Sequence, residues 1–225
     1  LLQNLEKITF TEHSINEKKW SSHSLNSNEL NLINNLISNC ITLTDVSTSK
    51  PGIVTAANKF FILNHSDVLK YNLEKYTKKI VQKGSFVGDK ITFDEDDFSN
   101  IQTNDLPCYF IDLNIQELDD EDSDILNYLN LGLEQKLHQR YKMQSRQKWF
   151  QVPYKAEATP LFFFKRCHNY PKLIRNFSSS FTTDSAYLVT PNEKFKAYSI
   201  LFSFYNSFTL VCAELMGRYY GGGVL

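Results

Sequence analysis

Paired cysteines and an initiator methionine are missing from this 225-residue sequence. The four cysteines, Cys40, Cys108, Cys167 and Cys212, are far apart and form no C-x-x-C pair. This spacing argues against a zinc site or a disulfide framework and is typical of reduced thiols in a cytoplasmic protein. Neighbouring strand residues point to opposite faces, so Cys167 next to His168 does not predict a metal site either. Without a signal peptide or a starting Met, we expect a fragment of a longer cytoplasmic protein.

Familiar catalytic, calcium-binding and membrane patterns are also missing. No Ser/His/Asp or paired-carboxylate site has a recognisable spacing. The acidic stretch Glu117–Asp124 lacks the glycine and the closing glutamate of an EF-hand, so we interpret it as an acidic cap on the next helix. The apolar stretch Phe195–Gly217 contains Asn206 and Glu214, which favours a buried helix over a transmembrane span. We therefore predict no metal and no membrane.

The charges are strongly segregated although the net charge is only −1. Residues 89–124 contain thirteen acidic residues and one basic residue, whereas residues 134–175 contain ten basic and two acidic residues. Such segregation produces a directional field, and a basic region rich in aromatics is typical of nucleic-acid binding. Two solvated faces of an ordinary protein explain the same pattern, so this alternative stays open.

Hydrophobic periodicity predicts a mixture of helices and strands. We expect helices over residues 29–38, from 125 onward and over 195–217, strands over residues 41–46, 91–93, 109–113 and 161–164, and a strand with its turn over residues 51–63. Residues 94–97 are predicted to be a loop. Length and composition allow one large domain or two small ones.

The stretch Pro51–Leu63 contains an unusual spacing of small, polar and aromatic residues. It resembles the G-x-x-T-G-x-N-x-F stretch that opens the target-recognition domain of TaqI-like N6-adenine DNA methyltransferases. The matching residues are Gly52, Thr55, Asn58 and Phe60. Ala56 stands where the family usually has glycine, and alanine adopts positive φ only at a cost.

Further residues match that family in the family's order. They are Tyr128–Leu129, Gly132, Arg140–Tyr141, Arg146 and Trp149–Phe150. The sequence lacks the F-x-G-x-G loop that binds S-adenosylmethionine and the [NDS]-P-P-[YF] catalytic motif. We therefore expect no methyl transfer from this chain alone, and no cofactor in it. S-adenosylmethionine and a catalytic methyltransferase domain are expected in the rest of the parent chain.

The resemblance covers roughly residues 41–225 and implies an α+β fold. We expect a twisted mixed β-sheet with flanking helices and a long buried C-terminal helix. Residues 1–40 would form a linker and an entry helix, residues 41–193 the target-recognition domain, and residues 194–225 the C-terminal helix and the start of a strand. The implied function is sequence-specific binding of duplex DNA within an N6-adenine methyltransferase of a restriction-modification system.

Candidate DNA contacts are basic and amide side chains at the ends of apolar segments. Cations bind phosphates, while Asn, Ser and Arg side chains can read base edges. The predicted contacts are Asn58, Lys59, Arg140, Lys142, Arg146, Lys165, Arg166, Arg175, Asn176, Ser178 and Ser179.

Other functions remain open. A specificity subunit of a type I restriction system would use a similar domain, although it usually carries two of them joined by coiled coils, and no sustained heptads occur here. A protein-interaction domain would explain the charge asymmetry equally well. A hydrolase with a dispersed active site is a third possibility.

Overall fold

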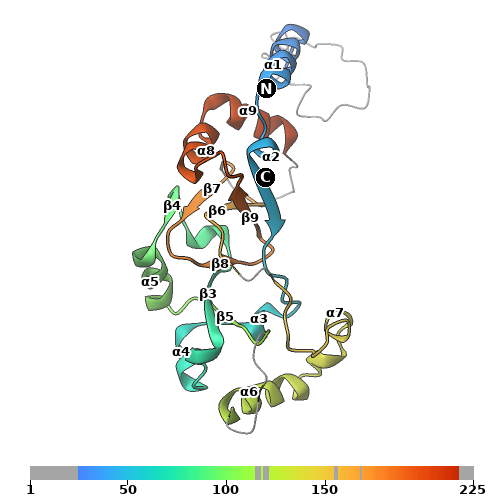
Figure 1. The fold of residues 1–225 in the computed structure, drawn as a ribbon, viewed down its shortest axis with the longest axis vertical. Helices are drawn as coiled ribbons and strands as arrows, with labels where there is room; N and C mark the ends of the chain where they lie inside the picture. The colour runs from blue at the N-terminus through green and yellow to red at the C-terminus, as the bar shows by residue number, and fades with distance from the viewer. Residues whose placement is uncertain (1–24, 115–117, 119–121, 155–156, 168, 218–225) are drawn as a thin grey trace, which may run out of the picture.

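The computed structural model describes residues 25–114, 118, 122–154, 157–167 and 169–217. They form an elongated body in which two β-sheets follow one another along the long axis (Figure 1). The helices are α1 (Ser27–Asn39), α2 (Leu43–Val46), α3 (Asn58–Phe61), α4 (His65–Lys70), α5 (Glu95–Thr103), α6 (Ser123–Glu134), α7 (Tyr141–Gln144), α8 (Ala197–Phe204) and α9 (Ser207–Met216). The strands are β1 (Ser47–Pro51), β2 (Ile62–Leu63), β3 (Thr77–Val81), β4 (Thr92–Phe93), β5 (Tyr109–Ile111), β6 (Leu161–Phe164), β7 (Leu173–Asn176), β8 (Phe181–Thr182) and β9 (Ala186–Pro191).

Both sheets are mixed, which confirms the predicted α+β class. The larger sheet has the strand order β1-β9-β6-β7-β4, and only its β4–β7 pair is parallel. The smaller sheet has the order β2-β5-β3-β8, with β3 and β8 parallel. The helices α1, α2, α8 and α9 lie at one end of the body, and α6 and α7 lie at the other (Figure 1).

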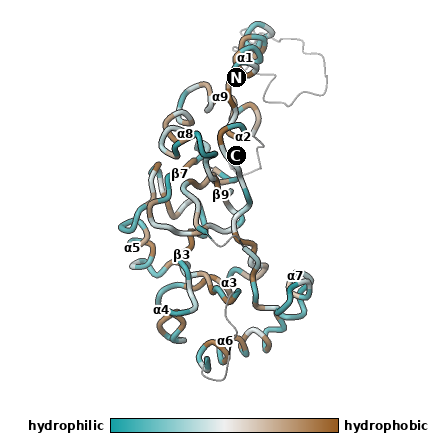
Figure 2. The backbone as a smooth tube through the Cα atoms, viewed as in Figure 1, coloured by the Kyte–Doolittle hydropathy of each residue, from teal (hydrophilic) through white to brown (hydrophobic). Residues whose placement is uncertain are grey.

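Strand β6 shows why the larger sheet is so apolar. Its sequence is Leu-Phe-Phe-Phe, and successive side chains of a strand face opposite sides. Phe162 and Phe164 pack in the cluster that contains α5 residues, whereas Leu161 and Phe163 pack in the cluster that contains α8 residues. Because both faces of the strand are covered, a continuous apolar run is stable there. Figure 2 shows these hydrophobic strands at the centre and a largely hydrophilic α7.

The smaller sheet packs in one core cluster with α3 and α6. On α6, Tyr128 stacks on Phe60, with ring centroids 4.7 Å apart, and its hydroxyl donates to the carbonyl of Phe60 at 2.8 Å. Gly132 sits where a Cβ would lie 2.4 Å from the ring of Trp149 and 2.7 Å from the ring of Phe60. Glycine therefore lets α6 approach these two aromatic rings closely.

Three local predictions in the first half of the chain are wrong. Residues 41–46 were expected to be a strand, but Thr42 and Asp45 form a capping box that starts helix α2. Residues 94–97 were expected to be a loop, but Asp94 and Asp97 form the same reciprocal cap and begin α5. Residues 51–63 were expected to be a strand with its turn, but helix α3 and only the short strand β2 follow the turn.

The predicted long buried C-terminal helix is two short helices. α8 and α9 are bent by 74° at a break around Asn206, whose side chain accepts from the backbone N–H of Thr209 at 2.9 Å and caps α9. Ile200 and Leu201 of α8 are buried, but no residue of α9 is. In the described part of the chain, no single helix is long and apolar enough to cross a membrane, and only this bent pair approaches the requirement by length and composition.

Candidate functional site

The segment that precedes α3 is fixed by contacts with β8 and the β8–β9 turn. A Cβ on Gly52 would lie 2.2 Å from the carbonyl oxygen of Thr183, so only glycine fits this approach. Ala56 has φ 61°, the left-handed conformation that the family's glycine would adopt readily. The Thr55 hydroxyl donates to Oδ1 of Asn58 and accepts from the N–H of Ala57 at 3.2 Å. A left-handed turn therefore forms at Ala56, although alanine stands where the family usually has glycine.

Two arginines from the α7 region hold this turn from outside. Arg140 Nη1 donates to the carbonyl of Ala56 at 3.1 Å, and Arg146 Nη2 donates to the carbonyl of Thr55 at 2.8 Å. Arg146 also donates to the carbonyl of Trp149 at 3.2 Å and lies 5.7 Å from the ring centroid of Phe61. Burial lowers the pKa of Arg146 below its ordinary value. Arg146 is thus used by the fold, whereas Arg140 stays exposed at the surface.

A cleft of about 520 Å³, which we call the basic cleft, lies between this turn and the α6–α7 connection. It brings together four of the predicted contacts, which are Asn58, Lys59, Arg140 and Lys142. Among the described residues, Lys59 and Lys142 form no salt bridge. An adjoining hollow continues from Lys142 to Arg146. Five predicted residues therefore share one surface.

Two polar residues that line the basic cleft, Gln135 and Asp184, were not among the residues singled out from the sequence. Gln135 ends α6, and Asp184 comes from the β8–β9 turn. Gln135 lies just before the basic segment, which is a signal that could have identified it. Asp184 carries no such signal, because only the pairing of distant strands brings it to the cleft.

The remaining predicted residues lie on the larger sheet, away from the basic cleft. Lys165 is exposed and its Nζ lies 4.4 Å from the ring centroid of Tyr187, and Arg166 beside it is also exposed. Arg175 donates to the carbonyl of Pro160 at 2.6 Å, and burial lowers its pKa below the ordinary value. The guanidinium of Arg175 is therefore used mainly in hydrogen bonds within the protein.

The polar loop after β7 is an internal network, contrary to its predicted role as a reader of bases. The amide of Asn176 donates to the carbonyls of Thr159 at 2.9 Å and Ser180 at 3.0 Å. The Ser178 hydroxyl donates to Asn176 Oδ1 at 3.1 Å, and both side chains are buried. Of the predicted contacts in this loop, Ser179, at φ 54°, is the exposed one. Asn176 and Ser178 present no free group to a ligand, because the loop uses them to satisfy its own polar atoms.

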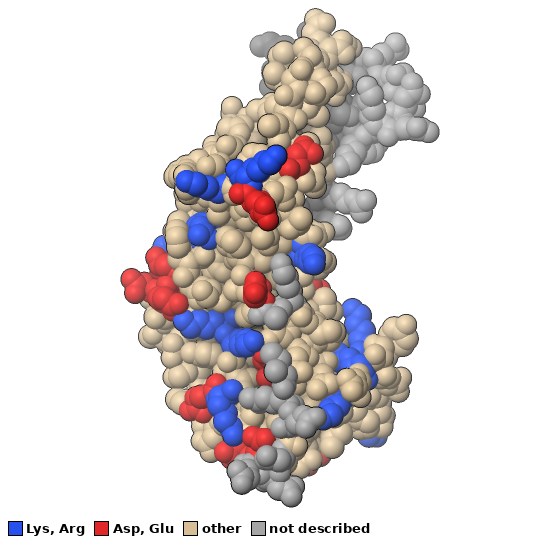
Figure 3. Space-filling view, in the orientation of Figure 1, with Lys and Arg blue, Asp and Glu red and all other residues tan. Residues whose placement is uncertain are grey.

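Charges of one sign gather locally, although both signs are mixed elsewhere on the face seen in Figure 3. Figure 3 shows acidic side chains gathered over α5 and basic side chains over α7. Several carboxylates of the acidic region pair with lysines: Lys79 with Glu95 at 2.5 Å, Lys78 with Asp112 at 2.8 Å, and Lys90 with Asp97. These lysines are neutralised locally, which leaves α7 and the basic cleft as the side suited to an anion.

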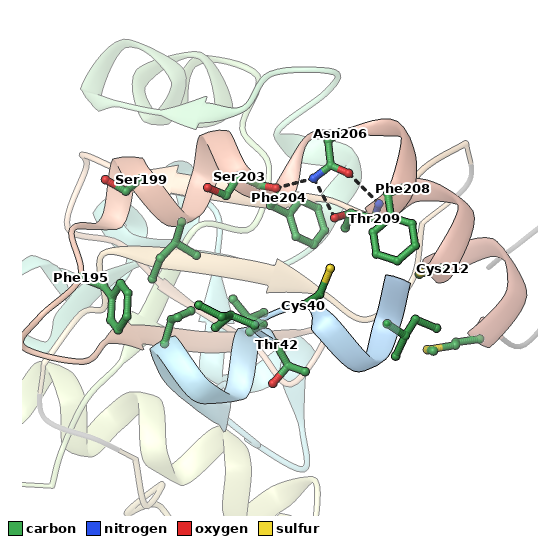
Figure 4. Close-up of a pocket in the computed structure, with 16 residues that line it drawn as sticks. Cys40, Thr42, Phe195, Ser199, Ser203, Phe204, Asn206, Phe208, Thr209 and Cys212 are labelled. Atoms are coloured by element: carbon green, nitrogen blue, oxygen red, sulfur yellow. Dashed lines mark hydrogen bonds between the residues drawn. The ribbon is translucent and has the colours of Figure 1, made fainter. Parts of the chain in front are cut away.

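A second cavity of about 520 Å³ lies at the opposite end, between α1, α2, α8 and α9. We call it the apolar groove. Figure 4 shows Cys40, Phe195, Phe204 and Phe208 around it, with the Asn206 amide bonded to Ser203 and Thr209. No charged residue lines it. A groove of this kind suits apolar surface rather than a polyanion.

Three glycines in the described part of the chain are packed against other segments, whereas Gly88 has open space around it. Gly52, Gly84 and Gly132 each lie against another segment, so that an added Cβ would come within about 3 Å of it. None of these three glycines is free to cradle a cofactor. Within the described part of the chain, no group of three or more His, Cys, Asp or Glu residues could hold a metal ion.

The comparisons with known proteins agree with the sequence resemblance. Residues 17–225 match the family model described as type II methyltransferase M.Eco57I, C-terminal domain. The crystal structure of the type IIG restriction endonuclease BpuSI has a similar fold, with a TM-score of 0.54 and 15% sequence identity. The match covers 83% of this chain but only 23% of the BpuSI chain. No curated protein matches this chain. Since the family model spans nearly the whole sequence, the chain belongs to the family of the C-terminal domain of type II methyltransferase M.Eco57I.

Proposed function

We propose that this domain binds duplex DNA through the basic cleft and supplies target recognition to an N6-adenine DNA methyltransferase of a restriction-modification system. The observation that carries the proposal is the placement of Lys59 and Lys142, which are exposed and without salt bridges among the described residues, beside Asn58 on a fixed turn. Exposed cations on a rigid support neutralise phosphates and fix the orientation of a duplex.

The side chains of the basic cleft divide this work. Lys59, Lys142 and the free donors of Arg140 bind phosphate oxygens, because they are cations at the surface. The Thr55 hydroxyl donates to Oδ1 of Asn58. Because the oxygen of this amide faces the turn, its N–H groups face away from the turn. Those N–H groups can donate to acceptors on base edges in the major groove.

The chemistry belongs to the part of the enzyme outside this chain. In the proposed enzyme the target adenine leaves the base stack and enters a separate catalytic domain of the same polypeptide. S-adenosylmethionine supplies the methyl group there. The role of this domain is to hold the duplex in register while the base is displaced, and the cytoplasm is the compartment in which it meets DNA.

A salt titration with the complete protein tests the proposal. We expect the affinity for duplex DNA to fall linearly on a log–log plot against salt concentration, with a slope of about −0.9 for each phosphate contact. Analysis of adenine N6 methylation in the same DNA tests the reaction class. A protein that shows no binding at low salt, or binding independent of salt, would contradict the proposal.

The apolar groove favours a second candidate function, that of a protein-interaction domain. The same titration separates the two functions, because a protein-interaction domain gives no DNA binding to titrate. A specificity subunit of a type I system would instead bind DNA but methylate it only with a separate catalytic subunit.

A further inference from the structure

Tyr141 is the most exposed large apolar side chain in the described part of the molecule. Its exposed fraction is 86%, compared with 73% for Ile41, the next highest. Among the described residues, its ring makes no aromatic contact and its hydroxyl no hydrogen bond. This side chain belongs to none of the core clusters that the described residues form, and it takes no part in the hydrogen bonds by which Arg140 and Arg146 hold the turn. Packing within the domain therefore does not explain why a large ring stands at this position.

The backbone that carries Tyr141 is held in place. Leu137 and Met143, on either side of it in the chain, are buried with exposed fractions of 2% and 1%. Arg140 and Arg146 bond to the carbonyls of Ala56 and Thr55. Four anchors within ten residues fix the start of α7, so the ring projects from a rigid support.

The surroundings of the ring are cationic. Arg140 and Lys142, the chain neighbours of Tyr141, both line the basic cleft. From residue 135 to residue 156 the sequence contains no acidic residue and six basic ones. Exposed aromatic rings between cations are the arrangement by which proteins stack on nucleobases while binding the phosphates on either side.

We propose that the Tyr141 ring stacks on a nucleobase that has left the base stack of the bound DNA. The inference rests on the proposed function, and it adds a partner for one residue: an unstacked base in a duplex. The backbone that carries the ring is already held in place, and any base offers a π-face to the ring. The contact would therefore favour distorted DNA over regular DNA without reading its sequence.

The test compares two labelled duplexes, one fully paired and one with a single-base bulge, by fluorescence anisotropy with the complete protein. We expect the wild type to bind the bulged duplex more tightly. Tyr141→Ala should weaken that binding by about 5-fold to 150-fold, the range for removal of one base–aromatic stack. Tyr141→Phe should retain the wild-type affinity, because stacking needs the ring and not the hydroxyl.

Two controls separate this proposal from the proposed function. Tyr198→Ala removes an exposed tyrosine (53%) at the other end of the molecule and should leave both affinities unchanged. The salt slope of Tyr141→Ala should equal that of the wild type. If the wild type binds DNA with a steep salt dependence but Tyr141→Ala binds as tightly, only the stacking proposal fails. An equal loss in Tyr141→Phe would also overturn it, and a wild type that binds no DNA would overturn both proposals.

Discussion

The basic cleft and the apolar groove have nearly the same volume, about 520 Å³, but opposite linings. Three cations, two amides and one carboxylate line the basic cleft, whereas none of the described residues that line the apolar groove is charged. The supports differ as well. The basic cleft rests on a turn fixed by hydrogen bonds to two arginines, whereas the groove lies between helices of which α1 and α9 bury no residue. Volume alone therefore does not identify a site, and the lining and its support have to be considered together.

The largest effect is expected from the loss of Arg146, which holds the turn beside the basic cleft. Arg146→Ala leaves the carbonyls of Thr55 and Trp149 without their donor, and should lower the free energy of unfolding by about 1.5–3 kcal/mol. Thermal unfolding measures it. Arg166→Ala, which removes an exposed arginine, should not change the melting temperature. Equal stability of the two variants would contradict the stabilising role of the Arg146 hydrogen bonds.

Loss of the free cations should affect binding and leave stability unchanged. Lys59→Ala combined with Lys142→Ala removes two phosphate contacts, so duplex affinity should fall about 30-fold at physiological salt and the salt slope by about 1.8. The matched control is Lys194→Ala combined with Lys196→Ala, which removes the same charge near the apolar groove. A similar loss in the control would mean that net charge, rather than the basic cleft, governs binding.

Relief of the strained turn should stabilise the protein slightly. Ala56 has φ 61°, and a left-handed alanine costs roughly 1–2 kcal/mol, part of which a glycine regains at the expense of a more flexible unfolded chain. We expect Ala56→Gly to raise the unfolding free energy by about 0.5–1 kcal/mol in denaturant titrations. Ala57→Gly, at φ −154°, should instead lower it.

The smallest effect on stability at neutral pH is expected from Tyr205, which lies between α8 and α9 beside the apolar groove. The Tyr205 hydroxyl donates to the carbonyl of Leu173 at 2.8 Å, and burial raises its pKa to about 12. Unfolded tyrosine ionises near pH 10, so the unfolded state loses this proton first. The stability that this tyrosine contributes is present below pH 10 and is lost between pH 10 and about 12. Tyr205→Phe should remove this loss of unfolding free energy between pH 10 and about 12, whereas Tyr198→Phe should leave it unchanged.

Strong local signals allowed much of the fold to be predicted from the sequence. The run Leu161–Phe164 is a strand because four apolar residues lie between polar flanks, and the structure confirms its bounds. The helix predicted over residues 29–38 from its apolar spacing is present as Ser27–Asn39, with Asn26 as its N-cap. The segments 42–45 and 94–97 were misread because their acidic and hydroxyl residues are typical of both loops and capping boxes.

The candidate site was only partly predictable. Asn58, Lys59, Arg140 and Lys142 were predicted as contacts, and the fold brings them to one cleft. Asn176 and Ser178 are also polar, yet their side chains are buried by contacts with Thr159 and Ser180. Whether a polar side chain faces water or the interior depends on such tertiary contacts, which the local sequence does not encode.

The pairing of β1 with β9 has a consequence for biosynthesis. Ser47 lies opposite Pro191, and the turn at residues 52–53 is bonded to Thr182 and Ala186. Every cation of the basic cleft is synthesised before residue 143, but the strand that positions the turn emerges from the ribosome more than forty residues later. A nascent chain that ends before about residue 190 thus contains all the cleft's cations without the cleft itself, and the domain completes the cleft only after β9 has been synthesised.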